Sequence, residues 1–164
     1  MPVGLIVIFF IIFVDQLSKL LIVEWFVHSK GLEVLPYISY GWVELLPFLN
    51  IRLVWNTGIS FSMFSSGDNL TMYVILAVQV SIVILLLFWM KNSKNMLQFF
   101  IFGLIIGGAF GNIIDRVHYG AVVDFIDFFY NQYHFPTFNF ADIAISVGCF
   151  LWLVENIFLT KNQI

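Results

Sequence analysis

Charged residues are scarce in this chain, and their scarcity decides its class. Only 10% of the 164 residues are charged, whereas 61% are hydrophobic and the mean hydropathy is +0.97. Ordinary soluble domains contain about a quarter charged residues, and a domain this small cannot bury so much apolar surface. We therefore expect an integral membrane protein. Because the few lysines and arginines form no basic stripe, nucleic-acid binding is not expected.

Cysteine is almost absent as well. The single Cys149 excludes an internal disulfide and a cysteine-cluster metal site. It lies in an apolar segment, where a thiol ionises poorly, so we expect it to pack rather than to react. The N-terminus has neither a positive region nor a small-residue cleavage site, which favours a first membrane helix over a cleavable signal peptide.

Long apolar segments, in contrast, recur along the chain. Four of them are long enough to cross a hydrocarbon core of about 30 Å, and we expect helices at about residues 3–23, 70–90, 96–117 and 142–160. The second connection carries Lys91 and Lys94 and no acid, so the positive-inside rule places it, and both termini, in the cytoplasm. The predicted fold is a single domain, residues 1–164, with four transmembrane helices.

The two outward-facing connections are expected to carry structure of their own. Trp42–Leu46 and Leu49–Trp55 are rich in β-branched and aromatic residues and are separated by Pro47. This pattern predicts a small β-hairpin or sheet on the membrane surface, within about residues 40–62. The second of the outward-facing connections, about residues 118–141, is expected to form an interfacial loop or a short helix that acts as a lid.

Ionisable side chains inside apolar segments are costly, so each is a candidate for function. Asp15 and Lys19 are four residues apart and share one helix face. They are either an ion pair that stabilises packing or, as we favour, part of the lining of a site. Asn112, Asp115 and Arg116 share one side of the third helix. The alternative for this set is a polar helix terminus with Arg116 near the lipid headgroups.

Two carboxylates are candidates for catalysis. Asp142 follows Asn139 by three residues at the start of the fourth helix, where an acid alone would be interpreted as part of a helix cap. Asp124, in the second outer connection, is expected at the same depth, close to the outer membrane boundary. Independent caps need not gather in this way, and two carboxylates in one site suffice for peptide hydrolysis without a metal.

The remaining polar residues are expected to lie outside this site. His118 and His134 match no metal-binding spacing, so we expect no metal and no other cofactor. Asp127 is expected to be a solvated neighbour of Asp124, and Glu155 to lie toward the cytoplasmic end of its helix. No serine or cysteine stands in a nucleophile motif with a histidine base, which disfavours covalent acyl transfer.

The polar residues belong to five short motifs in a fixed order. They are Asp15-Gln16-x-Ser18-Lys19, Asn56-x-Gly58 with Phe61, Gly111-Asn112-x-x-Asp115-Arg116, Val122-Val123-Asp124-Phe125-Ile126 and Pro136-x-Phe138-Asn139-x-Ala141-Asp142. In this order they resemble the lipoprotein signal peptidases (signal peptidase II), which are aspartyl peptidases of the bacterial inner membrane. Ser60 is a small departure, because the family often has alanine there.

The resemblance implies that Asp124 and Asp142 are the catalytic dyad. The implied substrate is a prolipoprotein whose cysteine already carries diacylglycerol and which is cut just before that cysteine. The residues expected to bind substrate or support the site are Asp15, Lys19, Asn56, Gly58, Asn112, Asp115, Arg116 and Asn139. The implied partners are membrane lipids and the inhibitor globomycin. The implied form is a multi-pass monomer of the inner membrane, with its site near the outer face.

Two other classes stay open on the sequence alone. A small ion-coupled transporter or channel subunit would also need intramembrane Asp, Arg and Lys, although here the acids gather at one boundary and form no relay across the membrane. A non-enzymatic assembly factor could use the close helix contacts that Gly107, Gly108 and Gly111 permit. Cleavage of a lipid-modified peptide by the purified protein separates the peptidase from both.

The predicted topology can be tested by cysteine labelling. In a Cys149→Ser background, a cysteine at position 93, between Lys91 and Lys94, should not react with an impermeant reagent in intact cells. Cysteines within residues 119–140 should react, because that connection is expected outside. Labelling of position 93 from outside would invert the topology.

Overall fold

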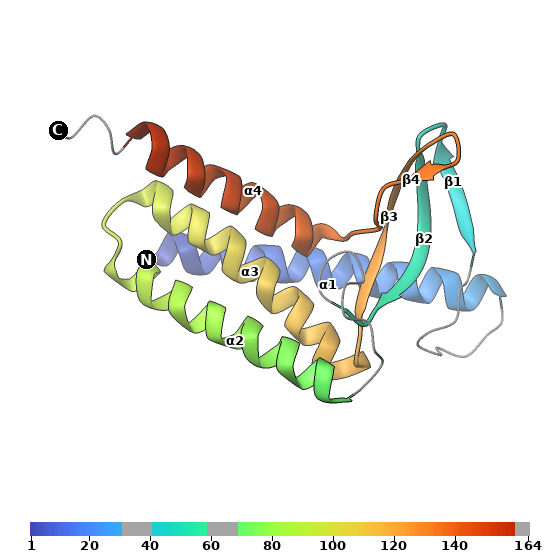
Figure 1. Ribbon diagram of the computed structural model, residues 1–164, viewed down its shortest axis with the longest axis horizontal. Coiled ribbons are helices and arrows are strands. Elements are labelled where there is room, and N and C mark those ends of the chain that lie inside the picture. Colours follow the sequence, from blue (N-terminus) through green and yellow to red (C-terminus); the bar gives the residue numbers. More distant parts are fainter. Residues whose placement is uncertain (31–40, 59–68, 160–164) are drawn as a thin grey trace.

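Four helices form a bundle, and a sheet stands at one end of it (Figure 1). The computed structural model describes residues 1–30, 41–58 and 69–159. The helices are α1 (Pro2–Lys30), α2 (Asn69–Asn92), α3 (Met96–Tyr119) and α4 (Phe140–Val154), and α4 continues as a π-helical turn, Glu155–Leu159. Four helices of the described chain are long and apolar enough to cross a membrane. The predicted membrane-helical fold is therefore confirmed.

Helix α3 lies at the centre of the bundle. Of its most apolar stretch 67% is buried, against 17–22% in the other three helices, whose outer faces carry exposed apolar side chains. Gly107 and Gly108 let α1 and α4 approach closely. A Cβ atom at Gly108 would lie only 2.5 Å from the carbonyl oxygen of Ala141, at the start of α4. Small residues at such contacts are typical of helices that associate in a bilayer.

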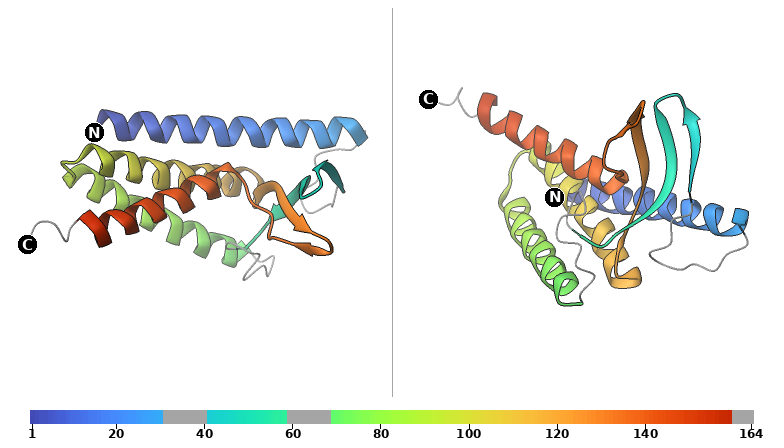
Figure 2. Two further views of the ribbon diagram at one scale, coloured as in Figure 1. Left: turned by 90° about the horizontal axis from the view of Figure 1, so that it is seen from above. Right: turned by 45° about the vertical axis from the view of Figure 1, so that its right-hand side comes forward.

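The sheet lies at one end of the bundle, alongside the C-terminal part of α1 (Figure 2), and its four strands pair in sequence order as antiparallel neighbours. Its strands are β1 (Trp42–Leu46), β2 (Leu49–Asn56), β3 (Val122–Tyr130) and β4 (Tyr133–His134). Strands β1 and β2 confirm the predicted hairpin. Phe61, Ser60 and the rest of the predicted β region up to residue 62 lie outside the described residues.

Residues 118–141 were expected to form an interfacial loop or a short helix, and the short helix is wrong, because this connection supplies β3 and β4 instead. The run Val122–Tyr130 is β-branched and aromatic apart from its two acids, which suits a strand. The edge of β2 gives it a partner, with Asp124 opposite Val54 and Asp127 opposite Asn50.

Helix α1 continues to Lys30, seven residues beyond the predicted end at residue 23. The reason is packing, because Val23 and Phe26 are buried against Leu53 and Trp55 of β2. This small apolar cluster joins the end of α1 to the sheet. It therefore fixes the sheet over the end of the bundle at which the candidate site lies.

Candidate active site

Asp124 lies in β3 and is only 2% exposed. Its two carboxylate oxygens accept hydrogen bonds from the side-chain amides of Asn56 (3.0 Å) and Asn139 (2.7 Å). Burial, and to a smaller extent the charge of Asp142, raises the pKa of Asp124 to about 7. A carboxyl group with a pKa near neutrality can hold or release a proton under physiological conditions, as acid–base chemistry requires.

Asp142 lies in the first turn of α4 and takes part in a capping box. The Asn139 side chain accepts from the Asp142 backbone N–H (2.9 Å), and Asp142 Oδ2 accepts from the Asn139 backbone N–H (3.3 Å). The other carboxylate oxygen accepts from the amide of Asn112 (2.9 Å). The interpretation of Asp142 as part of a cap is thus correct, and the cap fixes the carboxylate at the site.

Two asparagines connect the two carboxylates. The Asn139 amide donates to Asp124 and also approaches Asn112 Oδ1 at 3.2 Å, while the Asn112 amide donates to Asp142. Asn139 is completely buried and Asn112 is 5% exposed. This chain of amides holds the carboxyl groups of β3 and α4 in a fixed relation without placing a cation between them.

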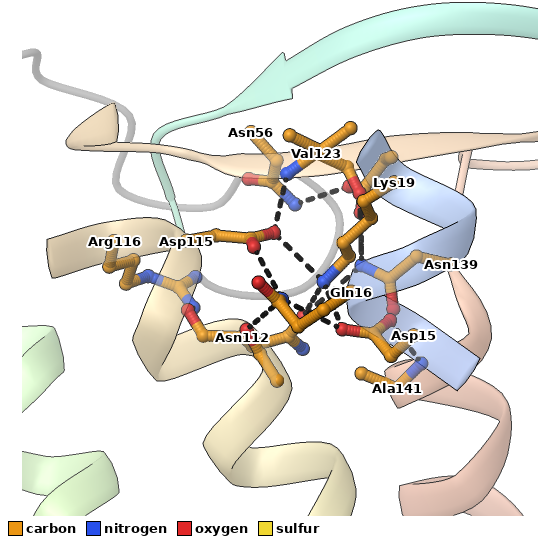
Figure 3. Close-up of polar contacts among 12 residues, drawn as sticks. Asp15, Gln16, Lys19, Asn56, Asn112, Asp115, Arg116, Val123, Asn139 and Ala141 are labelled. Carbon is orange, nitrogen blue, oxygen red and sulfur yellow. Dashed lines mark hydrogen bonds and ion pairs between the residues drawn. The ribbon is translucent and has the colours of Figure 1, made fainter. Parts of the chain in front are cut away.

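A buried ion cluster lies behind this chain (Figure 3). The Lys19 ammonium lies 2.8 Å from Asp15 and 2.8 Å from Asp115, and it donates to Asn112 Oδ1 at 3.1 Å. Neither Asp15 nor Lys19 is among the residues that line the cavity. Asp15 and Lys19 therefore do not line the cavity, although we favoured that role from the sequence. They support the site from behind.

The two acids of the cluster also hold backbone groups next to the site. Asp15 Oδ1 accepts from the Ala141 N–H (2.9 Å) in α4, and Asp115 Oδ2 accepts from the Val123 N–H (3.0 Å) in β3. Gln16 of α1 donates to Asp115 at 2.9 Å. The cluster thereby fixes the backbone immediately beside both Asp124 and Asp142.

Arg116 reaches from α3 to the end of β2. One guanidinium nitrogen donates to the Gly58 carbonyl (2.7 Å), and the other to Gln79 of α2 (3.3 Å). Gly58 in turn donates its N–H to the Asn56 side-chain oxygen (3.0 Å), which leaves the Asn56 amide free to face Asp124. Arg116 is 5% exposed, so its role is not that of a helix terminus reaching the headgroups.

Asp124, Asp142, Asn56, Asn112 and Arg116 all line one cavity of about 380 Å³. Its apolar lining comes from α2 on one side and from α4 and the segment after β4 on the other. The apolar and weakly polar lining residues include Val74, Ile75, Val78, Ile82, Ile145, Phe135, Pro136, Thr137 and Phe138. A few polar groups that converge in an apolar cavity are typical of a ligand site.

The expected environment of Asp127 is wrong. It was expected to be solvated, but it is 1% exposed and accepts hydrogen bonds from Asn50 (3.3 Å) and His134 (2.9 Å), with Arg52 at 3.8 Å. Pairing of β3 with β2 and β4 brings these three partners to it. In the described part of the chain, no group of three or more His, Cys, Asp or Glu residues could hold a metal ion.

Sequence reasoning overlooked Gln79, which lines the cavity and contacts Arg116. The signal was present, because Gln79 is a primary amide in the middle of an otherwise apolar membrane helix. Only ionisable side chains within the apolar segments were taken as candidates for function, and the side chain of Gln79 is an uncharged amide.

The fold and the site together define a multi-pass membrane protein with two carboxyl groups in one cavity at one end of its bundle, that of Asp124 buried and that of Asp142 half-buried. A family model described as signal peptidase (SPase) II matches residues 7–158, and the chain belongs to this family. The family consists of aspartyl peptidases that process prolipoproteins in the bacterial membrane, so the protein is a membrane-embedded peptidase. The resemblance stated from the five motifs is thereby confirmed.

Individual relatives agree with this assignment. The chain is 41% identical over 150 residues to the lipoprotein signal peptidase of Thermodesulfovibrio yellowstonii, covering 92% of this chain and 91% of the relative. It is 39% identical over 143 residues to that of Wigglesworthia glossinidia brevipalpis, covering 85% and 92%. A solved structure described as a bacterial membrane enzyme is 27% identical, with a TM-score of 0.78 over 100% of this chain and 93% of the other.

Removal of the Lys19 charge should destabilise the protein. Lys19→Met leaves Asp15 and Asp115 buried without their shared cation, so we expect a loss of about 3–5 kcal/mol, read as a lower Tm in detergent. Adding Asp15→Asn should restore part of the Tm, because it removes one of the two uncompensated charges. Lys91→Met, at an exposed lysine, is the control; an equal Tm for the two single variants would contradict the structural role of the cluster.

Proposed function

We propose that Asp124 and Asp142 are the catalytic dyad, and that they cleave diacylglyceryl-modified prolipoproteins immediately before the lipidated cysteine. The observation that carries this proposal is that a buried carboxyl group, that of Asp124, and a half-buried one, that of Asp142, line one cavity and are joined through Asn139 and Asn112. No other pair of acids among the described residues lines that cavity. The family's processing of prolipoproteins supports the substrate class.

In the proposed mechanism the dyad shares one proton. Asp124 carries it, because burial and the neighbouring Asp142 raise its pKa to about 7. We assign the role of base to Asp142, because it lies at the start of α4, where a helix N-terminus favours negative charge. Asp142 takes a proton from the water that attacks the scissile carbonyl, while Asp124 donates a hydrogen bond to the carbonyl oxygen. Collapse of the tetrahedral intermediate breaks the C–N bond as Asp142 passes the proton that it took from water to the leaving nitrogen, which returns the dyad to its starting state.

The apolar lining of the cavity suits a substrate that arrives from the bilayer. The lining from α2 and α4 is mostly apolar, and both helices expose apolar side chains elsewhere on their surfaces. A peptide between these helices would keep the acyl chains of its cysteine in the surrounding lipid. Asp15, Lys19 and Asp115 would support the site, Arg116 would position substrate, and a globomycin-type peptide would compete for the same cavity. No metal has a role in this mechanism, and a single chain supplies every residue that it uses.

We further propose that the sheet faces the outer side of the inner membrane and that both termini are cytoplasmic. The lysine-bearing connection between α2 and α3 lies at the end of the bundle away from the sheet (Figure 1). At the sheet end, Trp42, Tyr130 and Tyr133 are strongly exposed. Exposed Trp and Tyr are typical of the membrane–water interface.

Substitution of either acid tests the dyad. Asp124→Asn and Asp142→Asn should each abolish cleavage of a diacylglyceryl lipopeptide, because an amide can neither act as the base nor share the proton. Both variants should remain folded in detergent, and EDTA should leave wild-type activity unchanged. Near-normal turnover by either variant would refute the aspartyl mechanism. Inhibition by EDTA that a divalent metal reverses would indicate a metallopeptidase.

The pH dependence of kcat/KM gives an independent test. A dyad needs its single proton, and the proton leaves Asp124 as the pH rises through its pKa of about 7. Activity should therefore fall above about pH 7, approaching about tenfold per unit at higher pH. Asp127→Asn should keep this alkaline limb, because Asp127 lies outside the cavity. A flat wild-type profile up to about pH 9 would contradict the assignment of Asp124 as the proton carrier.

A further inference from the structure

Gln79 lies in the middle of α2, in a stretch that is otherwise almost wholly apolar. Between Val74 and Met90 the only other polar residue is Ser81, whose hydroxyl donates to the Ala77 carbonyl of its own helix at 2.7 Å. Gln79 makes no such local bond among the described residues. A side-chain amide at this depth is costly in hydrocarbon and indicates a role in a site.

The orientation of the Gln79 amide follows from its neighbour. A guanidinium has only donors, so the side-chain oxygen of Gln79 must face Arg116, which it contacts at 3.3 Å. The amide nitrogen, with two N–H donors, then faces away from Arg116 and has no hydrogen-bond partner in the part of the chain that the structure describes. Gln79 lines the same cavity as Asp124 and Asp142. Two free donors are therefore available at the wall opposite α4.

The proposed substrate supplies the missing acceptor. A peptide bond can be cut only where the chain is extended enough to enter the site, and an extended segment in the bilayer leaves its carbonyl groups without intrahelical partners. Each such carbonyl needs a donor from the protein. The segment on the signal-peptide side of the cleavage site lies in the membrane, where α2 forms a wall of the cavity.

From this geometry we infer that Gln79 is a substrate-binding residue. Its amide nitrogen donates to a backbone carbonyl of the extended signal-peptide segment, while its oxygen holds Arg116 in place. This assignment rests on the proposed peptidase function, and it extends that function to a residue of α2 that supplies no proton to the reaction. Arg116 is in turn tied to Gly58 at the end of β2, so one amide connects the substrate, α3 and the sheet.

The test is the KM of a diacylglyceryl lipopeptide. Gln79→Met keeps the length of the side chain and removes the donors, so KM should rise about three- to tenfold, as loss of one hydrogen bond predicts. We expect kcat to change by less than about twofold, since no proton transfer is affected. Ser81→Ala, two residues away on the same helix, is the matched control and should leave KM unchanged.

Gln79→Glu separates substrate binding from the anchoring of Arg116. Glutamate keeps an oxygen for Arg116 but has no amide donor, so its KM should also rise. If Gln79 acted only through Arg116, the Glu variant would match the wild type, and the inference would be overturned. An unchanged KM in folded Gln79→Met would overturn it as well. Failure of the wild-type protein to cleave the lipopeptide would instead overturn the proposed function, and this inference with it.

Discussion

The rest of the structure depends on one ammonium group, that of Lys19, between the carboxylates of Asp15 and Asp115. In a bundle whose helices meet lipid on their outer faces, burial of apolar surface adds little to helix association. Directional contacts must therefore fix the relative positions of the elements. Lys19 joins α1 to α3, and its two acids reach the backbone of α4 at Ala141 and of β3 at Val123. A single cation thereby orders α1, α3, α4 and β3, and the last three of these elements line the cavity.

Local sequence patterns were enough to predict the elements that contact mainly lipid or pair with a neighbouring segment of the sequence. The four apolar runs and the hairpin of β1 and β2 each express their structure within a short stretch of sequence. The Asp15–Lys19 pair is likewise local, because helix periodicity alone places residues four apart on one face. The depth argument predicted that Asp124 and Asp142 lie close together, and both line one cavity.

Non-local pairing explains what the sequence left unpredicted. Strand β3 forms beside β2, whose residues lie some seventy positions earlier in the chain, as in the pairing of Val54 with Asp124. Without that pairing Asp127 is an acid in a loop, and with it Asp127 is buried beside Asn50 and His134. Gln79 was missed for a related reason, since its polar partner Arg116 belongs to another helix. Such contacts depend on how distant elements are positioned against each other, and a short stretch of sequence does not determine this.

The capping box at the start of α4 limits how this site can change in evolution. Asn139 and Asp142 close the first turn of that helix, and Asp142 also lines the cavity, where Asn139 holds Asp124. A substitution at either position that weakened the binding of an inhibitor would also leave the end of a membrane helix without its cap. Resistance by mutation at these positions would therefore carry a cost in folding, which leaves the apolar lining from α2, whose residues cap no helix, as the easier route of escape.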